Sequence, residues 1–99
     1  MGGDPESWDV EILPGAGRDF RLLPDPERDE ALNIIEDMKE DPFLPGIEKV
    51  RSYNNRYKIR FGRGERYRLL ADIFPESRRV LIGVVELRGP RTYSGMDKW

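Results

Sequence analysis

Three segments in the second half of the chain, two that alternate between apolar and polar residues and a last one that is almost continuously apolar, restrict the fold more than any other feature. Residues 56–61 read RYKIRF, residues 66–74 read RYRLLADIF and residues 79–88 read RVLIGVVELR. Alternation with a period of two predicts strands, and the short GRGE and PESR segments between them are turns that suit antiparallel neighbours. The sequence therefore predicts an antiparallel meander whose last strand, almost continuously apolar, is central and covered on both faces.

The first half of the chain adds one more strand and one or two helices. Residues 8–13, WDVEIL, alternate as a half-buried strand does, and residues 16–23 have room for a short helix. Residues 25–42 predict a longer helix, and residues 43–55 form a linker rich in turn-forming residues. This order predicts an α+β fold in which one or two helices pack on one face of a small, mainly antiparallel four-stranded sheet.

The longer helix carries signals at its ends and along one side. Asp25 is predicted to be the N-cap, Pro26 the first helical residue and Pro42 the stop. The stripe that is predicted to face the core consists of Ala31, Leu32, Ile35 and Met38.

The composition excludes several classes of protein. The 99 residues include no cysteine and no histidine, which removes disulfides, thiolate chemistry, the commonest metal ligand and the commonest general base at neutral pH. The opening MGGDPESWDVEIL lacks the cationic and apolar regions of a secretory signal, and no stretch approaches the ~20 apolar residues of a membrane span. We expect a single cytoplasmic domain over residues 1–99, with flexible tails at 1–7 and 94–99, that needs no metal, no cofactor and no membrane.

Charge is divided unevenly between the two halves of the chain, although the net charge is only −2. Residues 1–50 hold 5 Lys/Arg and 14 Asp/Glu, a balance of −9, and residues 51–99 hold 12 and 5, a balance of +7. A basic half attracts polyanions, and the planar fork of arginine matches phosphate. The alternative is that the acidic half lies against the basic half and neutralises it, or that both are solvated faces.

Antiparallel pairing is expected to gather cations on one face of the sheet. The basic residues that would share this face, from three strands, are Lys58, Arg60, Arg66, Arg68 and Arg88. Like charges opposite each other destabilise a sheet by roughly 0.2 to 1 kcal/mol per pair, so a purely structural face is expected to alternate its charges. The cluster therefore favours a surface that binds phosphates, and a set of solvated arginines is the alternative.

The ordered set of these segments resembles a known family of toxins. The stretch LNIIEDMKEDPFLPGIEKVRSYNNRYKIRFGRGERYRLLADIFPESRRVLIGVVELRGPRTY contains a helix ended by DP, the LPG…EKV approach, the pair YKIRFG and RYRLLADI, and a last strand closing in R…Y. In this order, over roughly residues 8–93, the chain is similar to the RelE branch of the RelE/ParE superfamily of bacterial toxins. The resemblance implies a toxin that cleaves messenger RNA in the ribosomal A site and is held inactive by an antitoxin encoded beside it.

The resemblance also implies roles for particular residues. Lys58 and Arg60 take the places of two basic residues on one strand, Arg68 that of the transition-state arginine, Arg88 that of the arginine ending the last strand and Tyr93 that of the closing tyrosine. A tyrosine there can stack on an unpaired base, with plain packing as the alternative. Further contacts to RNA are expected from Arg56, Arg66 and Arg91.

The chemistry of metal-free RNA cleavage fits these residue types. The reaction needs the ribose 2′-OH deprotonated, the phosphorane charge stabilised and the leaving oxygen protonated. Arginine stays protonated in proteins, so the arginines of the set are expected to donate hydrogen bonds to phosphate oxygens. Lys58 serves as the base if neighbouring charges depress its pKa. Glu86 is an alternative base and Glu48, in the linker, is a weaker one; the other reading of either acid is that it is only an ion-pair partner.

Two other functions fit the same features. A ParE-like toxin shares the fold but blocks DNA gyrase without cleaving RNA, and a non-catalytic basic module would only bind RNA. Arg88 and Tyr93 together favour the RelE branch. The sequence therefore predicts a metal-independent endoribonuclease toxin whose partners are the ribosome, messenger RNA and an antitoxin that covers the cationic face.

Overall fold

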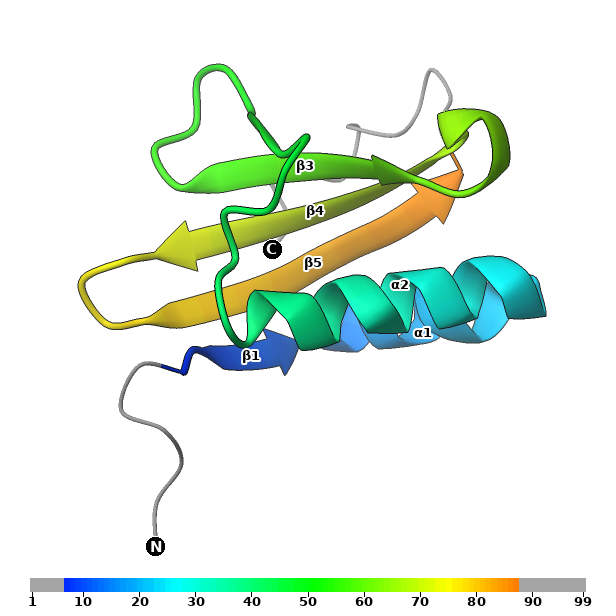
Figure 1. Cartoon of the computed structure of the whole chain (residues 1–99), viewed down its shortest axis with the longest axis horizontal. Coiled ribbons are helices and arrows are strands. Elements are labelled where there is room, and N and C mark those ends of the chain that lie inside the picture. The colour runs from blue at the N-terminus through cyan, green and yellow to red at the C-terminus, as the bar shows by residue number, and fades with distance from the viewer. Residues whose placement is uncertain (1–6, 88–99) are drawn as a thin grey trace, which may run out of the picture.

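Five strands form one mixed sheet in the order β1-β5-β4-β3-β2 (Figure 1). Their bounds are β1 Asp9–Ile12, β2 Glu48–Lys49, β3 Arg56–Phe61, β4 Tyr67–Phe74 and β5 Arg79–Leu87. β3, β4 and β5 form the predicted antiparallel meander, β1 pairs with β5 in parallel and β2 adds to the outer edge of β3. The computed structural model describes residues 7–87, so Arg88, Arg91, Tyr93 and the two predicted tails, apart from Ser7, lie outside the described residues.

Both helices, α1 at Pro14–Leu22 and α2 at Asp25–Met38, lie on the same face of the sheet (Figure 1). This arrangement confirms the predicted α+β class. α2 begins one residue earlier than predicted, because Pro24 rather than Asp25 occupies the N-cap position. Asp25 lies instead in the first turn, where its Oδ1 accepts a 2.9 Å hydrogen bond from Nη2 of Arg28. Within residues 7–87, every helix is too short or too polar to cross a membrane.

The core lies between the helices and the face of β3, β4 and β5 that turns toward them. It contains Ala16, Phe20, Ala31, Ile35, Met38, Ile59, Phe61, Leu69, Ala71, Ile73, Val80, Ile82 and Val85, together with Leu23. The predicted stripe on α2 was right at three positions and wrong at Leu32, which is 43% exposed. A residue that directly follows Ala31 lies about 100° around the helix from it, outside the narrow stripe that Ala31, Ile35 and Met38 define. β5 is an inner strand, as predicted, although its second face is only partly buried at Leu81 and Val84.

The segment that was predicted to be a linker contributes the fifth strand. β2 is only two residues long, and Glu48 and Lys49 pair with Lys58 and Tyr57. Phe43 anchors the start of this segment, because its ring packs edge-on against the rings of Trp8 and Tyr57. The distances between ring centroids are 6.1 Å to Trp8 and 5.5 Å to Tyr57. The four-stranded prediction was therefore one strand short.

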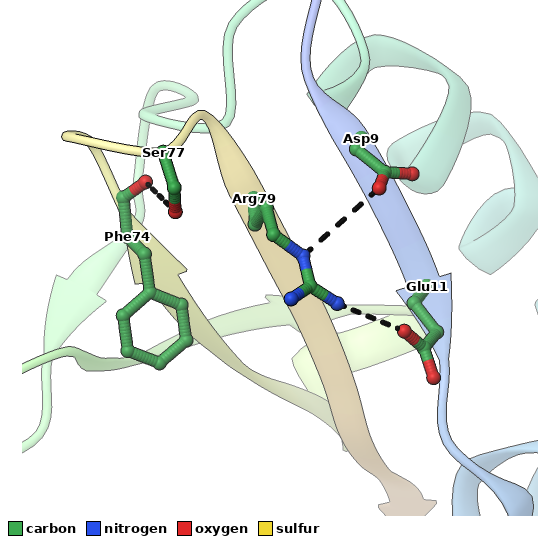
Figure 2. Close-up of polar contacts among 5 residues, drawn as sticks. All are labelled: Asp9, Glu11, Phe74, Ser77 and Arg79. Carbon is green, nitrogen blue, oxygen red and sulfur yellow. Dashed lines mark hydrogen bonds and ion pairs between the residues drawn. The ribbon is translucent and has the colours of Figure 1, made fainter.

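The parallel pair of β1 and β5 carries ion pairs on its surface. Arg79 lies between two acidic residues of β1, with Nη2 at 3.1 Å from Oε1 of Glu11 and Nε at 4.0 Å from Oδ2 of Asp9 (Figure 2). The preceding turn is fastened by Ser77, whose Oγ donates to the carbonyl oxygen of Phe74 at 3.5 Å (Figure 2). The Arg79 side chain is half exposed, so each pair contributes about 0.2–1 kcal/mol at most and mainly favours this register.

Candidate nucleic-acid interface

On the sheet face opposite the helices, strand pairing aligns charged residues in two adjacent rows. The first row runs across the sheet through Glu48, Lys58, Leu70 and Val84. The second row joins Arg60, Arg68 and Glu86. Ile59 and Leu69, which alternate with these residues, lie in the helix-side core. The sheet therefore brings Lys58, Arg60 and Arg68 to one face, as alternation in the sequence predicts.

Arg60 and Arg68 lie directly opposite each other on β3 and β4. Arg60 is exposed, whereas only 3% of Arg68 is. The Arg68 guanidinium turns back to the β3–β4 connection, where Nη1 donates to the carbonyl oxygens of Glu65 at 2.9 Å and Tyr67 at 3.2 Å. Its Nε is buried without a hydrogen-bond partner among the described residues. A buried unsatisfied donor costs about 1–3 kcal/mol, so this arginine would gain from an acceptor such as a phosphate oxygen.

The β3–β4 connection that receives Arg68 depends on glycine. Gly62 and Gly64 have φ angles of 83° and 66°, in the region that side chains disfavour. A Cβ atom on Gly62 would also lie 2.7 Å from Cδ2 of Tyr67. The tight path of residues 62–66 therefore sets where the Glu65 carbonyl meets Arg68.

Glu48 reaches this face because of β2. It lies opposite Lys58, and its Oε1 is 3.3 Å from Nη2 of Arg60. Both side chains of the ion pair are well exposed, 48% for Glu48 and 41% for Arg60, so the pair is weak, about 0.2–1 kcal/mol, and easily exchanged for another partner. A pocket of about 470 Å³ opens beside it, lined by residues 45–48, by Ile59 and Arg60 of β3 and by Glu65.

The other predicted cations are placed differently. Lys58 is partly buried in the first row. Arg66 is exposed but lies in the connection just before β4, so it is at the rim of the face and not on a strand. Arg56 is only 6% exposed, and it binds Asp72 in a fork, with Nε to Oδ1 at 2.7 Å and Nη2 to Oδ2 at 3.0 Å. This arrangement makes Arg56 a support of the sheet and leaves little of it open to RNA.

Glu86 closes the second row at the other edge of the sheet, next to Asp19 of α1. Burial, and then repulsion from Asp19, raise the pKa of the Glu86 carboxyl above its ordinary 4.5. Burial also raises the pKa of Asp19 above 3.8, although the Val85 amide, which donates to Oδ2 at 3.1 Å, and the charge of Arg18 lower it in part. Glu86 therefore belongs to an acid pair at the edge of the interface, whereas Glu48 lies among its cations.

The structure of this chain is similar to several solved structures. The toxin–antitoxin complex RelBE2 of Mycobacterium tuberculosis contains a chain that is 26% identical, with a TM-score of 0.68, over 83% of this chain and 99% of that one. A mutant E. coli toxin RelE in the free state is 22% identical, with a TM-score of 0.76, over 93% and 96%. The YoeB dimer of Staphylococcus aureus is 13% identical, with a TM-score of 0.66, over 84% and 99%. This chain has the RelE fold. No protein-family model matches the sequence, and no curated protein sequence matches it significantly.

The likeness to the RelE branch that the sequence indicated is thus confirmed in three dimensions. Within the described part of this RelE fold, Asp and Glu residues nowhere form a group of three or more that could hold a metal ion. Two acidic residues, Asp72 beside Arg56 and Asp19 beside Glu86, were not among the predicted site residues. Asp72 could have been found, because the register that sets Arg60 opposite Arg68 also sets Arg56 opposite Asp72. Asp19 left no such signal, because its role depends on how α1 packs against β5.

Proposed function

We propose that this chain is the toxin of a type II toxin–antitoxin system and that it cleaves messenger RNA on the ribosome without a metal ion. The RelE fold supports the assignment, since the similar structures include toxins of this kind, several of them in complex with an antitoxin. The observation that carries the proposal is the pair Arg60 and Arg68. Two arginines directly opposite on a sheet, one with an unsatisfied buried donor, cost stability that an oxyanion would restore.

The proposed reaction needs three things: removal of the proton of the ribose 2′-OH, stabilisation of the negative charge on the phosphorane, and protonation of the leaving 5′-oxygen. The ribose 2′-oxygen loses its proton to a base and forms a bond to phosphorus, the bond from phosphorus to the 5′-oxygen breaks, and the 5′-oxygen takes up a proton. Arg60 and Arg68 are assigned to the phosphorane oxygens, because their guanidinium groups stay charged and offer several donors. Arg68 is almost fully buried, so its contact with phosphate requires a rearrangement around the β3–β4 connection when RNA binds.

Among the three candidate bases, Glu48 is the one that the geometry favours. It lies opposite Lys58 and 3.3 Å from Arg60, so a phosphate held by Arg60 brings the 2′-OH toward this carboxylate. Lys58, across the strand from Glu48, is then the proton donor for the leaving 5′-oxygen. Glu86 lies at the far edge beside Asp19, where it faces another acid and not the candidate catalytic cations.

The remaining residues of the proposal take supporting roles. Arg66 at the rim contacts RNA phosphates, and Arg88, Arg91 and Tyr93, which lie outside the described residues, keep the roles that the family resemblance implies. Arg56 is reassigned from RNA binding to the support of β3 and β4. The proposed partners are the ribosome with its messenger RNA and an antitoxin protein that covers the cationic face, and the proposed location is the cytoplasm.

Programmed ribosomes test the proposal. Purified protein is treated with chelator, desalted and added to ribosomes that carry an end-labelled messenger, and the expected product is a messenger cut at the ribosomal A site. Arg60→Ala and Arg68→Lys are each expected to lower the single-turnover rate by about 10²–10³, the effect of losing one donor to a developing oxyanion. Arg18→Ala, an equal loss of charge on α1 and away from this face, is expected to leave the rate unchanged.

The rival functions predict other results. An uncut messenger together with inhibited DNA supercoiling would replace the proposal with a ParE-like toxin. Binding to ribosomes or RNA without cleavage would replace it with a non-catalytic RNA-binding module. Thermal melting of each variant separates a loss of chemistry from a loss of folding, which matters for Arg68 because it fastens the β3–β4 connection.

A further inference from the structure

A groove that is lined by both acidic and apolar side chains lies between the end of α1 and the end of β5. Its volume is about 430 Å³. The residues that line it are Asp19, Leu22, Leu23, Pro24, Tyr67, Val85, Glu86 and Leu87. It is separate from the pocket beside Glu48, and the RNA chemistry proposed above uses neither its acids as a pair nor its leucines. We name it the acidic groove.

Among the described residues, the two acids of the groove have no lysine or arginine as an ion-pair partner. Asp19 accepts a hydrogen bond from the Val85 amide, and within residues 7–87 neither Asp19 nor Glu86 forms an ion pair with a lysine or arginine. Arg18 acts on Asp19 only through its charge at a distance, and Asp19 and Glu86 repel each other. Two partly buried carboxylates that line the same groove and repel each other are stabilised by a cation that enters between them.

The apolar rim of the groove is exposed to an unusual degree. Leu22 is 83% exposed and Leu87 is 57% exposed, and these are the two most exposed large hydrophobic side chains of residues 7–87. Both lie on the rim of the same groove. Exposed leucines that flank charged groups in a concave surface are typical of contacts to another polypeptide.

The edge of β5 shows how a partner can approach. β1 pairs with β5 only up to Ile82, and farther along β5 the Val85 N–H donates to Oδ2 of Asp19 on α1. Asp19 already occupies that N–H, so an incoming strand cannot pair with β5 there. A partner must therefore bind through its side chains and not by extending the sheet.

We propose that the acidic groove binds a segment of a partner protein that presents a lysine or arginine between aliphatic side chains. The cation lies between Asp19 and Glu86, and the aliphatic groups cover Leu22 and Leu87. Because Glu86 is also opposite Arg68 in the sheet, a segment in this groove continues over the edge of β5 toward the cationic face. The antitoxin is the natural occupant, and to that extent the inference rests on the proposed function.

A tripeptide titration tests the groove without RNA, ribosomes or an antitoxin, so its failure and the failure of the nuclease proposal are distinguishable. The probe is acetyl-Leu-Arg-Leu-amide, added to the ¹⁵N-labelled full chain and followed by amide chemical shifts. We expect shifts at Val85, Glu86 and Leu22, with weak affinity because the ligand is small. Acetyl-Leu-Glu-Leu-amide is expected to leave these amides unmoved, and acetyl-Gly-Arg-Gly-amide to bind more weakly than the probe.

Variants assign the two kinds of contact. The double variant Asp19→Asn with Glu86→Gln keeps the hydrogen-bond acceptor for Val85 and is expected to weaken the probe by about fivefold or more, from the loss of two charge contacts. Leu22→Ala is expected to weaken it by about fivefold through lost apolar burial. Leu32→Ala on α2, another exposed leucine outside the groove, is the matched control and is expected to have no effect.

Three results would overturn the inference. One is the absence of shifts at Val85 and Glu86, and another is equal binding of the glutamate peptide. The third is binding that neither the double variant nor Leu22→Ala weakens. Shifts at the same amides that depend only on protein concentration would instead assign the groove to a second copy of the chain. Well-dispersed spectra of the variants exclude misfolding as the cause of lost binding.

Discussion

The substitution Glu48→Gln distinguishes the two proposed roles of Glu48, as the general base and as the ion-pair partner of Arg60. As the base it must accept the 2′-OH proton, and as the partner of Arg60, at 3.3 Å, it competes with phosphate for the same guanidinium. Glutamine cannot accept the proton, so the cleavage rate is expected to fall by about 10²–10⁴. The ion pair is well exposed and worth about 0.2–1 kcal/mol, so its loss is expected to tighten RNA binding by about 1.4- to 5-fold. The variant should therefore bind better and cut far more slowly.

Single-turnover cleavage on programmed ribosomes measures both effects, the rate at saturating toxin and the concentration that gives half of that rate. Glu11→Gln is the matched control, because Glu11 is also a well-exposed glutamate paired with an arginine across two strands, at the opposite side of the sheet. Its rate and half-saturation are expected to stay at the wild-type values. An unchanged rate in Glu48→Gln would refute the base assignment and leave Lys58, and unchanged affinity would refute the competition for Arg60.

Three further substitutions test the support of the interface. Arg56→Ala leaves the partly buried Asp72 without its partner and is expected to lower the free energy of unfolding by up to about 3–5 kcal/mol in urea titrations, whereas Arg56→Met with Asp72→Leu should recover most of it; equal losses in both would contradict the pairing argument. Asp19→Asn removes a carboxyl whose pKa is raised in the folded state, so wild-type stability falls relative to the variant as pH rises through and above 3.8, and parallel stability curves would refute this sign. Gly62→Ala, at φ 83° and with a 2.7 Å clash, is expected to cost about 1–3 kcal/mol by thermal melting, and an unchanged melting temperature would show that the connection tolerates a side chain.

The meander was predictable because its information is local. In RYKIRF and in the first half of RYRLLADIF the side chains alternate, and the short connection fixes the register, so Arg60 opposite Arg68 follows from the sequence. The same register also predicts the ion pair of Arg56, because it places Asp72 directly opposite Arg56. The ion pair of Arg56 with Asp72 is therefore as predictable from the sequence as the pairing of Arg60 with Arg68.

The remaining features depend on contacts between distant segments. β2 is two residues long, too short for alternation to be visible, and it forms only because β3 offers an open edge. The position of Glu48 among the cations follows from that pairing and so could not be ranked above Glu86 from the sequence. Leu32 shows a different limit, since an apolar residue in an amphipathic helix does not reveal whether the core extends to its side. Leu22 in α1 is a stronger case, because it is 83% exposed.

The division of charge along the chain is also a division in space, which explains how a protein of net charge −2 can offer a cationic face. The exposed acids of α2 and of the turn that follows it are on the helix layer, and they include Asp29, Glu30, Glu36 and Asp37 of the helix and Glu40 of the turn. Among the described residues, ion pairs between the acidic and basic halves are those of Arg60 with Glu48 and of Arg79 with Asp9 and Glu11. The molecule measures 41 × 31 × 25 Å, and charges are screened over about 8 Å at physiological ionic strength. A phosphate at the sheet therefore senses Lys58, Arg60 and Arg68 much more than the helix acids, and within residues 7–87 the acidic half offsets a cation of this face only through Glu48, which pairs with Arg60.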